Sequence, residues 1–449
     1  MKQYDDIIIG FGKGGKTLAA KLRAKGETVA LIEASKEMYG GTCINVACIP
    51  SKSLEKNARL SAAIGGSFEE KAKRYRQAIE EKRALTAMLR GKNHDKLVQA
   101  GVDVIDGTAS FKDARHVLVD GKKTLQAKRI FINTGSRPVL PPISGLSESK
   151  HVFTSETMME QEQLPERFAI IGGGYIGLEF ASYYANFGSR VTILQDGDAF
   201  IPKEDRDVAQ SVLDSFSKRN ITVMKGVKIT KVHDEAGGVV IETSAGPVEA
   251  DAVLVATGRR PNVQELALEK AGVKLTERGA VMTDEHLMTN VEGIYAIGDV
   301  AGSLQFTYIS LDDSRIIAST LAGDGKRTTK NRGAVPYTVF LDPPLSRIGL
   351  SEEEAKAAGL EIKTATLPAA AIPKAQVLRQ PTGILKVIIG AKTDKILGAH
   401  LFCAESYEMI NLIKMAMDAG IPYMALRDAI YTHPTMTEAF NDLFSLVQA

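Results

Sequence analysis

The chain has 449 residues, of which 44% are hydrophobic and 24% are charged, and its formal net charge at pH 7 is +2. A chain of this length and ordinary globular composition is expected to form two to four domains. The balanced charge, without long runs of one sign, favours neither nucleic acid nor an anionic membrane as a partner, so small molecules are the expected ligands. The sequence contains no apolar run of signal-peptide or membrane-span length, and we expect a cytoplasmic protein.

The N-terminal segment 4–35 has the pattern of a strand, a glycine turn, a helix and a second strand. Gly10, Gly12 and Gly15 have the spacing G-x-G-x-x-G, and Glu33 ends the second strand. The glycines alone are weak evidence, because an ordinary tight turn explains them equally well. The surrounding strands, helix and acid favour a dinucleotide site, in which Gly12 lets a pyrophosphate approach the helix N-terminus and Glu33 binds a ribose.

The same pattern recurs at residues 167–198. Gly172, Gly174 and Gly177 repeat the glycine spacing, and Gln195 stands at the end of the second strand. Two copies of so long a pattern are difficult to obtain by chance. We therefore expect a second Rossmann-like dinucleotide-binding domain on this chain.

Two similar sequence segments, and a strand pattern that follows the second unit, predict how the two units are connected. IFINTGSRP at 130–138 follows the first unit, and VLVATGRRP at 253–261 follows the second. The strand pattern GIYAIGDVAG at 293–302 comes after the second unit is complete, which indicates that the second domain is inserted in the first; an ordinary strand and loop is the alternative. The charged segment 67–99 has helical spacing and is expected to be a solvated helix without chemistry.

The sequence beyond Arg332 changes to hairpin-forming strands and an apolar helix at 405–420, which predicts a third, α+β domain. Core packing is the expected role of Cys403 and of Met409, Met415 and Met417, in preference to metal binding. The expected limits are 1–145 and 263–330 for the two parts of the first nucleotide domain, 146–262 for the second nucleotide domain, and 331–449 for the C-terminal domain.

Cys43 and Cys48 lie in the segment GGTCINVACIPSK, and the chain has only one other cysteine. So few cysteines exclude a disulfide framework and favour a catalytic or metal-binding pair. A protein with two dinucleotide sites most economically passes electrons between a pyridine nucleotide and a flavin. The pair could then carry the electrons away as a dithiol. Unreacted thiols and half of a zinc site are the alternatives, and the zinc site lacks a second Cys or His pair at suitable spacing.

Helix geometry limits how this pair can be arranged. Five residues along an ideal α-helix span about 7.5 Å, whereas a disulfide requires Cα atoms within roughly 7 Å. A helix that begins at the cysteines must therefore be distorted, and Pro50 is expected to contribute. The helix N-terminus and Lys52 are expected to favour the thiolate.

The C-terminal segment YTHPTMTEAF contains His433 and Glu438. A lone histidine before a proline is more often structural. A dithiol enzyme, however, requires a general base for one sulfur, and a histidine oriented by a carboxylate is the usual solution.

Five segments resemble the class I pyridine nucleotide-disulfide oxidoreductases, the family of glutathione reductase, lipoamide dehydrogenase and mercuric reductase. They are GGTCINVACIPSK, GGGYIGLEF, VLVATGRRPN, IYAIGDV and HPTMTE, and the resemblance covers the whole chain in order. Within the family, MYGGTCIN, LQFTYISLDDSR, PPLSRIGLSEEEA and HPTMTEAFNDLFSLV are similar to the bacterial reactive-chlorine resistance and hypothiocyanous acid reductase group.

The resemblance implies FAD in the first domain, NADH or NADPH in the second, and a homodimer formed by the C-terminal domain. It also implies that Cys48 faces the flavin, that Cys43 is the exposed interchange thiol, and that His433, held by Glu438, reaches Cys43 of the other subunit. The FAD residues implied are Gly10, Gly12, Gly15, Glu33, Gly41, Thr42, Lys52, Thr134, Gly135 and Asp299, the last at the ribityl chain. The NAD(P) residues implied are Gly172, Gly174, Tyr175, Gly177, Glu179, Gln195 and Gly258. Among these, Tyr175 matches the lid over the nicotinamide pocket, and Lys52 and Glu179 match an ion pair beside the flavin.

Two positions depart from the family pattern. Ala47 stands where the family usually has glycine, which is expected to alter the helix between the cysteines. Gln195 stands where NADH enzymes often carry an acid, but the arginines that would hold a 2′-phosphate are also missing from LQDGDAFIPKED. The balance favours NADH.

These observations lead to the hypothesis of an NAD(P)H-driven flavoprotein that reduces hypothiocyanous acid or related reactive chlorine-derived oxidants, with Cu(II) as a further substrate that the resemblance implies. A Cys43 thiolate can attack a small soft electrophile, and Cys48 can resolve the adduct. A conventional disulfide reductase of the dihydrolipoamide dehydrogenase type is the first alternative. A flavin redox sensor or metal-binding protein is the second, and no resident metal site is expected.

Overall fold

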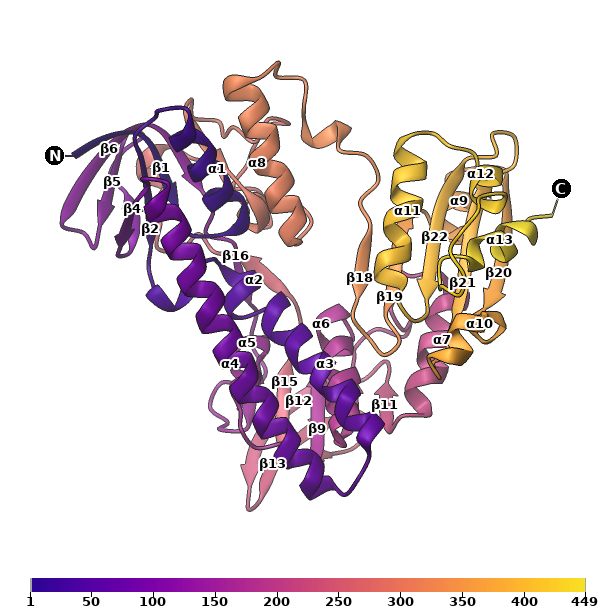
Figure 1. Ribbon diagram of the computed structural model, residues 1–449. Helices are drawn as coiled ribbons and strands as arrows, with labels where there is room; N and C mark the ends of the chain where they lie inside the picture. The colour runs from indigo at the N-terminus through magenta and orange to yellow at the C-terminus, as the bar shows by residue number, and fades with distance from the viewer. Residues whose placement is uncertain (1, 449) are drawn as a thin grey trace.

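The computed structural model describes residues 2–448 and contains three sheets of five or more strands. In Figure 1 the N-terminal strands lie at the left, the strands of residues 152–255 below them, and the yellow C-terminal elements at the right. This arrangement confirms the predicted class, two Rossmann-like α/β units followed by an α+β unit. The domain limits stay predictions. Within residues 2–448, no helix is both long and apolar enough to cross a membrane.

The first sheet has seven strands, in the order β3-β2-β1-β6-β5-β4, and β17 adds to β6. β17 pairs in parallel with β6 although the whole second sheet separates the two strands in sequence. The strands are β1 (Lys2–Ile9), β2 (Val29–Glu33), β3 (Asp103–Asp106), β4 (Ala109–Phe111), β5 (His116–Val119), β6 (Lys123–Ile132) and β17 (Ile294–Ala296).

Both faces of the first sheet are covered, which explains the unbroken apolar run in β1. Ile7 and Ile9 pack into one core and Ile8 into the other, because successive side chains of a strand point to opposite faces. Helices α1 (Lys13–Ala24) and α8 (Thr307–Ala322) lie side by side on the face with Ile8. The loops that leave the carboxyl ends of these parallel strands are where a nucleotide is expected to bind.

The second sheet is parallel throughout, with the order β11-β10-β9-β15-β8. An antiparallel meander of three strands lies beside it, and α6 follows its glycine turn. The elements are β8 (Val152–Thr154), α5 (Ser155–Met158), β9 (Arg167–Ile171), α6 (Tyr175–Phe187), β10 (Arg190–Leu194), α7 (Arg206–Ser217), β11 (Ile221–Met224), β12 (Ile229–Glu235), β13 (Gly238–Thr243), β14 (Val248–Ala250) and β15 (Ala252–Val255).

A short ribbon joins the two nucleotide units. β7 (Ser136–Pro138) and β16 (Arg259–Pro261) pair in antiparallel fashion, so the two matching phrases of the sequence lie against each other. Arg259 strengthens the ribbon, since its guanidinium donates to the hydroxyl and the carbonyl of Ser136 at 3.0 and 2.7 Å.

The C-terminal unit is a five-stranded antiparallel sheet with the order β18-β19-β22-β21-β20. Its apolar face packs against α11 and α13. The elements are β18 (Tyr337–Val339), β19 (Leu345–Gly349), α9 (Glu352–Ala357), β20 (Ile362–Pro368), α10 (Pro373–Val377), β21 (Ile384–Gly390), β22 (Ile396–Phe402), α11 (Ser406–Asp418), α12 (Tyr423–Arg427) and α13 (Ala439–Ser445).

Two expectations for helices need correction. The charged segment does form α4 (Phe68–Gln99), which begins with a capping box between Ser67 and Glu70, but its side facing the protein is buried at Tyr75 and Ile79. It is therefore not a solvated helix all round. Cys403 and Met409 are buried as expected, and Met417 packs against the core, whereas Met415 is 69% exposed and the core prediction for it is wrong.

Candidate functional site

The two cysteines of the close pair lie on consecutive helices rather than on one. Cys43 lies in the single turn α2 (Thr42–Asn45), and Cys48 is the first residue of the 17-residue helix α3 (Cys48–Ile64). The backbone breaks between them, at Ala47, which has φ −143° and ψ −100°. The expected distortion is confirmed, and a negative φ lets Ala47 stand where the family usually has glycine.

Hydrogen bonds polarise this pair of thiols. The pKa of Cys48 is lowered, first by a hydrogen bond from the Cys43 thiol and then by Thr307 and the charge of Lys52, although burial opposes this. The pKa of Cys43 is correspondingly raised, because its proton is shared with Cys48 and its side chain is partly buried. The Thr307 hydroxyl lies 3.4 Å from the Cys48 sulfur. In the reduced pair the negative charge is therefore favoured on Cys48, which also begins a long helix, and the proton on Cys43.

An ion pair lies along the same helix. The Lys52 ammonium, one turn after Cys48 on α3, is 2.7 Å from a carboxylate oxygen of Glu179 on α6. The other oxygen of Glu179 accepts the backbone N–H of Phe340 at 2.9 Å, and the ring of Phe340 lies 4.7 Å from the Lys52 nitrogen. Segments of both nucleotide units and the C-terminal unit thus hold the pair in place.

The glycines of the first unit are fixed by close contacts. A Cβ on Gly12 would lie 2.4 Å from the side-chain oxygen of Asn133, and that oxygen accepts the backbone N–H of Gly15 at 2.9 Å. Gly10 has φ +100°, and a Cβ there would lie 2.5 Å from the Asn133 carbonyl oxygen. Gly41 has φ +81°, and its Cβ would lie 2.7 Å from the Cα of Gly12. The glycine loop therefore lies directly against the segment that carries the cysteines.

The other predicted FAD residues lie around the same edge of the first sheet. Glu33 accepts the backbone N–H of Phe11, in the glycine loop, at 2.9 Å, and burial raises the pKa of its carboxyl group. Gly135 faces Thr42, whose hydroxyl would lie 3.8 Å from a Cβ there. Two further contacts complete the edge: the Thr134 hydroxyl donates to the Asn262 carbonyl at 2.7 Å, and the Asp299 carboxylate accepts the Ser136 hydroxyl at 2.6 Å.

The chemistry of this edge is compatible with the adenosine diphosphate part of FAD. Gly12, the N-cap residue of α1, has no side chain, and no Cβ could be added without displacing Asn133. The bare backbone of a helix N-terminus is the kind of site that a pyrophosphate approaches, and Glu33 presents a carboxylate at the end of the next strand, as a ribose requires.

The second unit repeats the glycine arrangement. Gly172 has φ +111°, and its Cβ would lie 2.5 Å from the Ala256 carbonyl oxygen. A Cβ on Gly177 would lie 2.3 Å from the Gly172 carbonyl oxygen, and Gly174 is the N-cap residue of α6. Gly258 has φ +126° between β15 and β16. The second turn therefore shares the positive φ of its first glycine and a glycine N-cap with the first unit, but it is more open, because a Cβ on Gly174 would come no closer than 4.0 Å to the Ala256 carbonyl oxygen.

Gln195 and Tyr175 are held by contacts within and beyond the second unit. The Gln195 amide nitrogen donates to the carbonyls of Gly197 and Ala199 at 2.7 and 3.0 Å, so this buried side chain fixes its own loop. Tyr175 is the first residue of α6, and its hydroxyl donates to Glu204.

The predicted histidine pair is formed, but away from the cysteines of its own chain. Nδ1 of His433 lies 2.8 Å from a carboxylate oxygen of Glu438, and the His433 side chain is 71% exposed. In Figure 1 the helices on either side of this segment, α12 and α13, lie at the far right, whereas α2 lies near the centre. The structure thus brings together the cysteines, Lys52 and Glu179, but not the histidine.

Sequence reasoning missed four residues that contact the predicted site. Asn133 precedes the predicted Thr134 at the end of a buried strand, where a polar residue is a usable signal. Thr307, Phe340 and Glu204 reach their partners only through tertiary structure, and nothing local in the sequence marks them.

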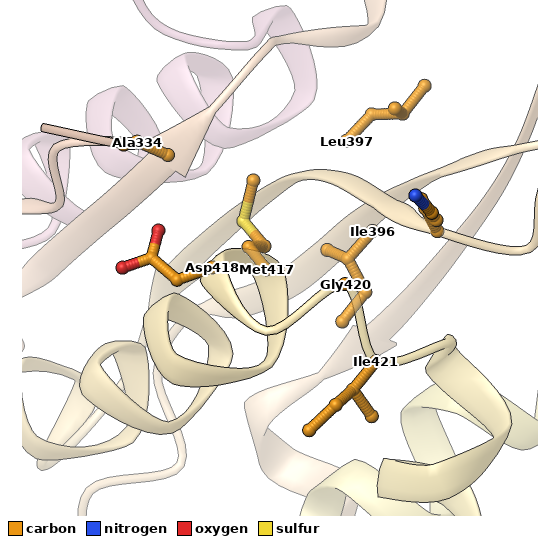
Figure 2. Close-up of a pocket in the computed structure, with 9 residues that line it drawn as sticks. Ala334, Ile396, Leu397, Met417, Asp418, Gly420 and Ile421 are labelled. Atoms are coloured by element: carbon orange, nitrogen blue, oxygen red, sulfur yellow. The ribbon is translucent and has the colours of Figure 1, made fainter. Parts of the chain in front are cut away.

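A surface pocket of about 340 Å³ lies elsewhere, in the C-terminal unit (Figure 2). Figure 2 shows Met417 and Asp418 on one side and Ile396 and Ile421 on the other. Its lining is largely apolar and includes no residue of the predicted site, so we assign it no role in the chemistry. The lining residues are Gly333, Ala334, Lys395, Ile396, Leu397, Met417, Asp418, Gly420 and Ile421.

The family is settled by two matches that span most of the chain. Residues 4–314 match the model of the pyridine nucleotide-disulphide oxidoreductases, and residues 335–444 match the dimerisation domain of these enzymes. The chain belongs to this family. It is therefore an oxidoreductase, and membership in the family implies FAD and NAD(P)H.

Similar proteins narrow the group. The chain is 45% identical to the probable pyridine nucleotide-disulfide oxidoreductase RclA of Escherichia coli (strain K12), with 100% of both chains covered. It is 33% identical to a dihydrolipoyl dehydrogenase of Corynebacterium glutamicum, with 98% of this chain and 97% of that protein covered. The solved Cu(II) complex of the HOCl-induced flavoprotein disulfide reductase RclA from Escherichia coli superposes with a TM-score of 0.95, at 45% identity and full coverage of both chains. The chain is thus an RclA-like flavoprotein disulfide reductase, and its close cysteine pair fits a redox-active disulfide.

Proposed function

We propose that this flavoprotein uses NAD(P)H to reduce hypothiocyanous acid or related reactive chlorine-derived oxidants through a Cys43–Cys48 disulfide, and that it acts in the cytoplasm. The polarised thiol pair carries the proposal, because it supplies a thiolate and a thiol side by side at the edge of the first sheet. The 45% identity to RclA, whose structure is described as that of an HOCl-induced disulfide reductase, supports the choice of substrate.

FAD, when bound, accepts a hydride from NAD(P)H and passes two electrons to the disulfide. We propose that the glycine loop at Gly12 and the Glu33 carboxylate bind its adenosine diphosphate part, and that Asp299 binds its ribityl chain. Lys52 and Glu179 would lie beside the flavin, with Cys48 as the sulfur that faces it. The second glycine loop, at Gly174, would bind the nicotinamide nucleotide.

The reduced pair can then consume one molecule of hypothiocyanous acid. The Cys43 sulfur attacks the oxidant's sulfur while a base accepts its proton, the S–O bond breaks, and the base passes that proton to the departing hydroxide, which leaves as water. The Cys48 thiolate next attacks the Cys43 sulfur, forms the disulfide and releases thiocyanate. The oxidant gains two electrons and the two cysteines lose two, so the disulfide is ready for the next NAD(P)H.

We propose that His433 assists the proton transfer from Cys43. Its Nδ1–H donates to Glu438 at 2.8 Å, which leaves the lone pair of Nε2 free to act as a base. Because the segment is exposed and lies away from α2, the Cys43 that it serves would belong to the second subunit of a homodimer. The match to the dimerisation domain of the family supports this arrangement.

A conventional disulfide reductase is the second candidate. The 33% identity to a dihydrolipoyl dehydrogenase over nearly the whole of both chains favours it, because that protein has the same overall organisation. The two candidates differ only in the electron acceptor.

One experiment separates them. The FAD-loaded protein is mixed with NADH or NADPH, and nucleotide oxidation is followed with hypothiocyanous acid, lipoamide, oxidised glutathione or Cu(II) as the acceptor. We expect rapid turnover with hypothiocyanous acid and little with the organic disulfides. The reverse pattern would replace the proposed substrate by a disulfide, and turnover with Cu(II) alone would assign a metal reductase.

The same experiment compares the two nucleotides, and we propose a preference for NADH. Gln195 takes the place of the acid that binds a ribose in many NADH enzymes, but its amide is used within its own loop. The neighbouring Arg206 donates to the carbonyls of Phe200 and Ile201, so its guanidinium is occupied away from a 2′-phosphate. A higher kcat/KM with NADPH would contradict this preference.

Lys52→Met is expected to raise the pKa of Cys48. The positive charge of Lys52 lowers this pKa, and without it the carboxylate of Glu179 would act on Cys48 unopposed. The thiolate would then form only at higher pH, which is measured from its ultraviolet absorbance in the reduced protein. Lys56→Met, on an exposed position of the same helix, is the matched control and should leave the titration unchanged.

A further inference from the structure

Tyr175 and Tyr337 donate their hydroxyl groups to the same carboxylate oxygen of Glu204. Tyr337 lies 2.6 Å from that oxygen, and the two tyrosine hydroxyls lie 3.1 Å apart. Glu204 is only 2% exposed. Tyr175 begins α6, Glu204 precedes α7, and Tyr337 begins β18, so the contact joins the second nucleotide unit to the C-terminal sheet.

The backbone that carries the Glu204 carboxylate is held on more than one side. The backbone carbonyl of Glu204 accepts Arg206, and that of the preceding Lys203 accepts the buried Arg347. The Tyr337 ring stacks on Phe306 at a centroid distance of 5.9 Å, next to the Thr307 that contacts Cys48. Neither Glu204 nor Tyr337 can therefore follow Tyr175 if the latter moves.

The second oxygen of Glu204 has no comparable partner. It lies 3.9 Å from Nδ1 of His400, and neither atom has a hydrogen bond to another residue of the described chain. Nε2 of His400 donates to the Leu350 carbonyl at 3.1 Å, and burial lowers the pKa of the ring, which favours the neutral form with no proton on Nδ1. The positive charge of Arg347 also acts on Glu204, but the carboxylate accepts hydrogen bonds only from the two tyrosine hydroxyls within the described residues, so releasing Tyr175 removes one of its two donors.

We propose that Glu204 is a latch that holds Tyr175 closed over the nicotinamide pocket, with Tyr337 as the second donor that keeps the carboxylate in place. The inference rests on the proposed binding of the nicotinamide nucleotide at the second glycine loop and on the lid role that the family resemblance implies for Tyr175. A nicotinamide that enters must displace the ring and break its hydrogen bond to Glu204. The apparent dissociation constant is the intrinsic dissociation constant divided by the fraction of molecules in which Tyr175 is open. Because the latch lowers that fraction, it weakens nucleotide binding. Glu204 is thereby a positioning residue for nucleotide access.

The test compares Glu204→Gln, Tyr175→Phe and the double variant, each loaded with FAD. Binding of a tetrahydro analogue of NADH, which cannot give up a hydride, is measured by calorimetry. Each single variant is expected to bind the analogue about three- to tenfold more tightly, since a hydrogen bond to a charged group is weakened or lost. The double variant should bind no more tightly than Tyr175→Phe, because Glu204 acts only through that hydroxyl.

Tyr4→Phe is the matched control, since Tyr4 donates to Asp103 at the far edge of the first sheet. Its affinity for the analogue should equal that of the wild type. Unchanged affinity in Glu204→Gln, or effects of the two single variants that simply add, would overturn the latch. This test does not depend on the substrate. If the wild type binds the analogue and is reduced by NADH but does not reduce hypothiocyanous acid, the proposed substrate is wrong and the latch proposal still stands. A wild type that binds no nucleotide would overturn both proposals.

Discussion

Cys43→Ser is expected to lower NAD(P)H-dependent reduction of hypothiocyanous acid by about a thousandfold or more. The serine hydroxyl does not ionise near neutral pH, cannot attack the oxidant's sulfur efficiently and cannot form a disulfide with Cys48. Reduction of the bound FAD by NAD(P)H should persist, because it precedes the step that uses Cys43. Steady-state turnover and rapid-mixing measurements of flavin reduction check these two results separately.

Cys48→Ser is expected to stop the reaction one step later. Cys43 would still attack the oxidant, but no second thiol would displace thiocyanate, so Cys43 would carry the sulfenyl thiocyanate adduct. Mass spectrometry of the pre-reduced variant after one equivalent of oxidant detects the adduct. Cys403→Ala is the control, because this thiol is buried in the C-terminal core. Normal turnover of hypothiocyanous acid by the Cys43→Ser variant would contradict the proposed attack of Cys43 on the oxidant.

The sequence predicted those parts of the protein that local backbone physics specifies. A turn that needs a glycine with positive φ between a strand and a helix produces a short glycine motif in the sequence. Gly10 and Gly172 could both be recognised from this motif. His433 and Glu438 were predicted from the chemistry of a dithiol enzyme, and their contact is also local, since the two partners are only five positions apart.

The missed contacts are those that the tertiary fold creates. Thr307 is 259 residues from Cys48, and Tyr337 is 133 residues from Glu204. No periodicity relates such partners before the fold is known. The error at Met415 is different, because helical periodicity already contained the answer: six residues after Met409 at about 100° each turn Met415 about 120° away from the buried Met409 around α11. The prediction that Met415 packs in the core gave more weight to the apolar side chain than to its position on the helix.

His433→Gln is expected to slow oxidation of the reduced cysteine pair by about a hundredfold or more, the usual contribution of a positioned base. Glutamine keeps the polarity and approximate size of the side chain but cannot accept the Cys43 proton. Rapid mixing of the pre-reduced enzyme with hypothiocyanous acid measures this step. His233→Gln is the matched control, since His233 also lies beside a glutamate, Glu235, but on the meander strand β12. Equal rates in the His433 variant and the control would exclude a base at this position.

The same variant tests whether the site is shared between subunits. When Cys43→Ser and His433→Gln chains are unfolded together and refolded, half of the dimers are expected to be mixed. If each site combines Cys43 of one subunit with His433 of the other, a mixed dimer has one site with both defects and one intact site. The mixture should then regain about a quarter of wild-type turnover, although neither parent is active. If each site were built within one subunit, every site of the mixed dimer would carry one defect and no activity would return. The recovered activity therefore reports directly which chain supplies the base.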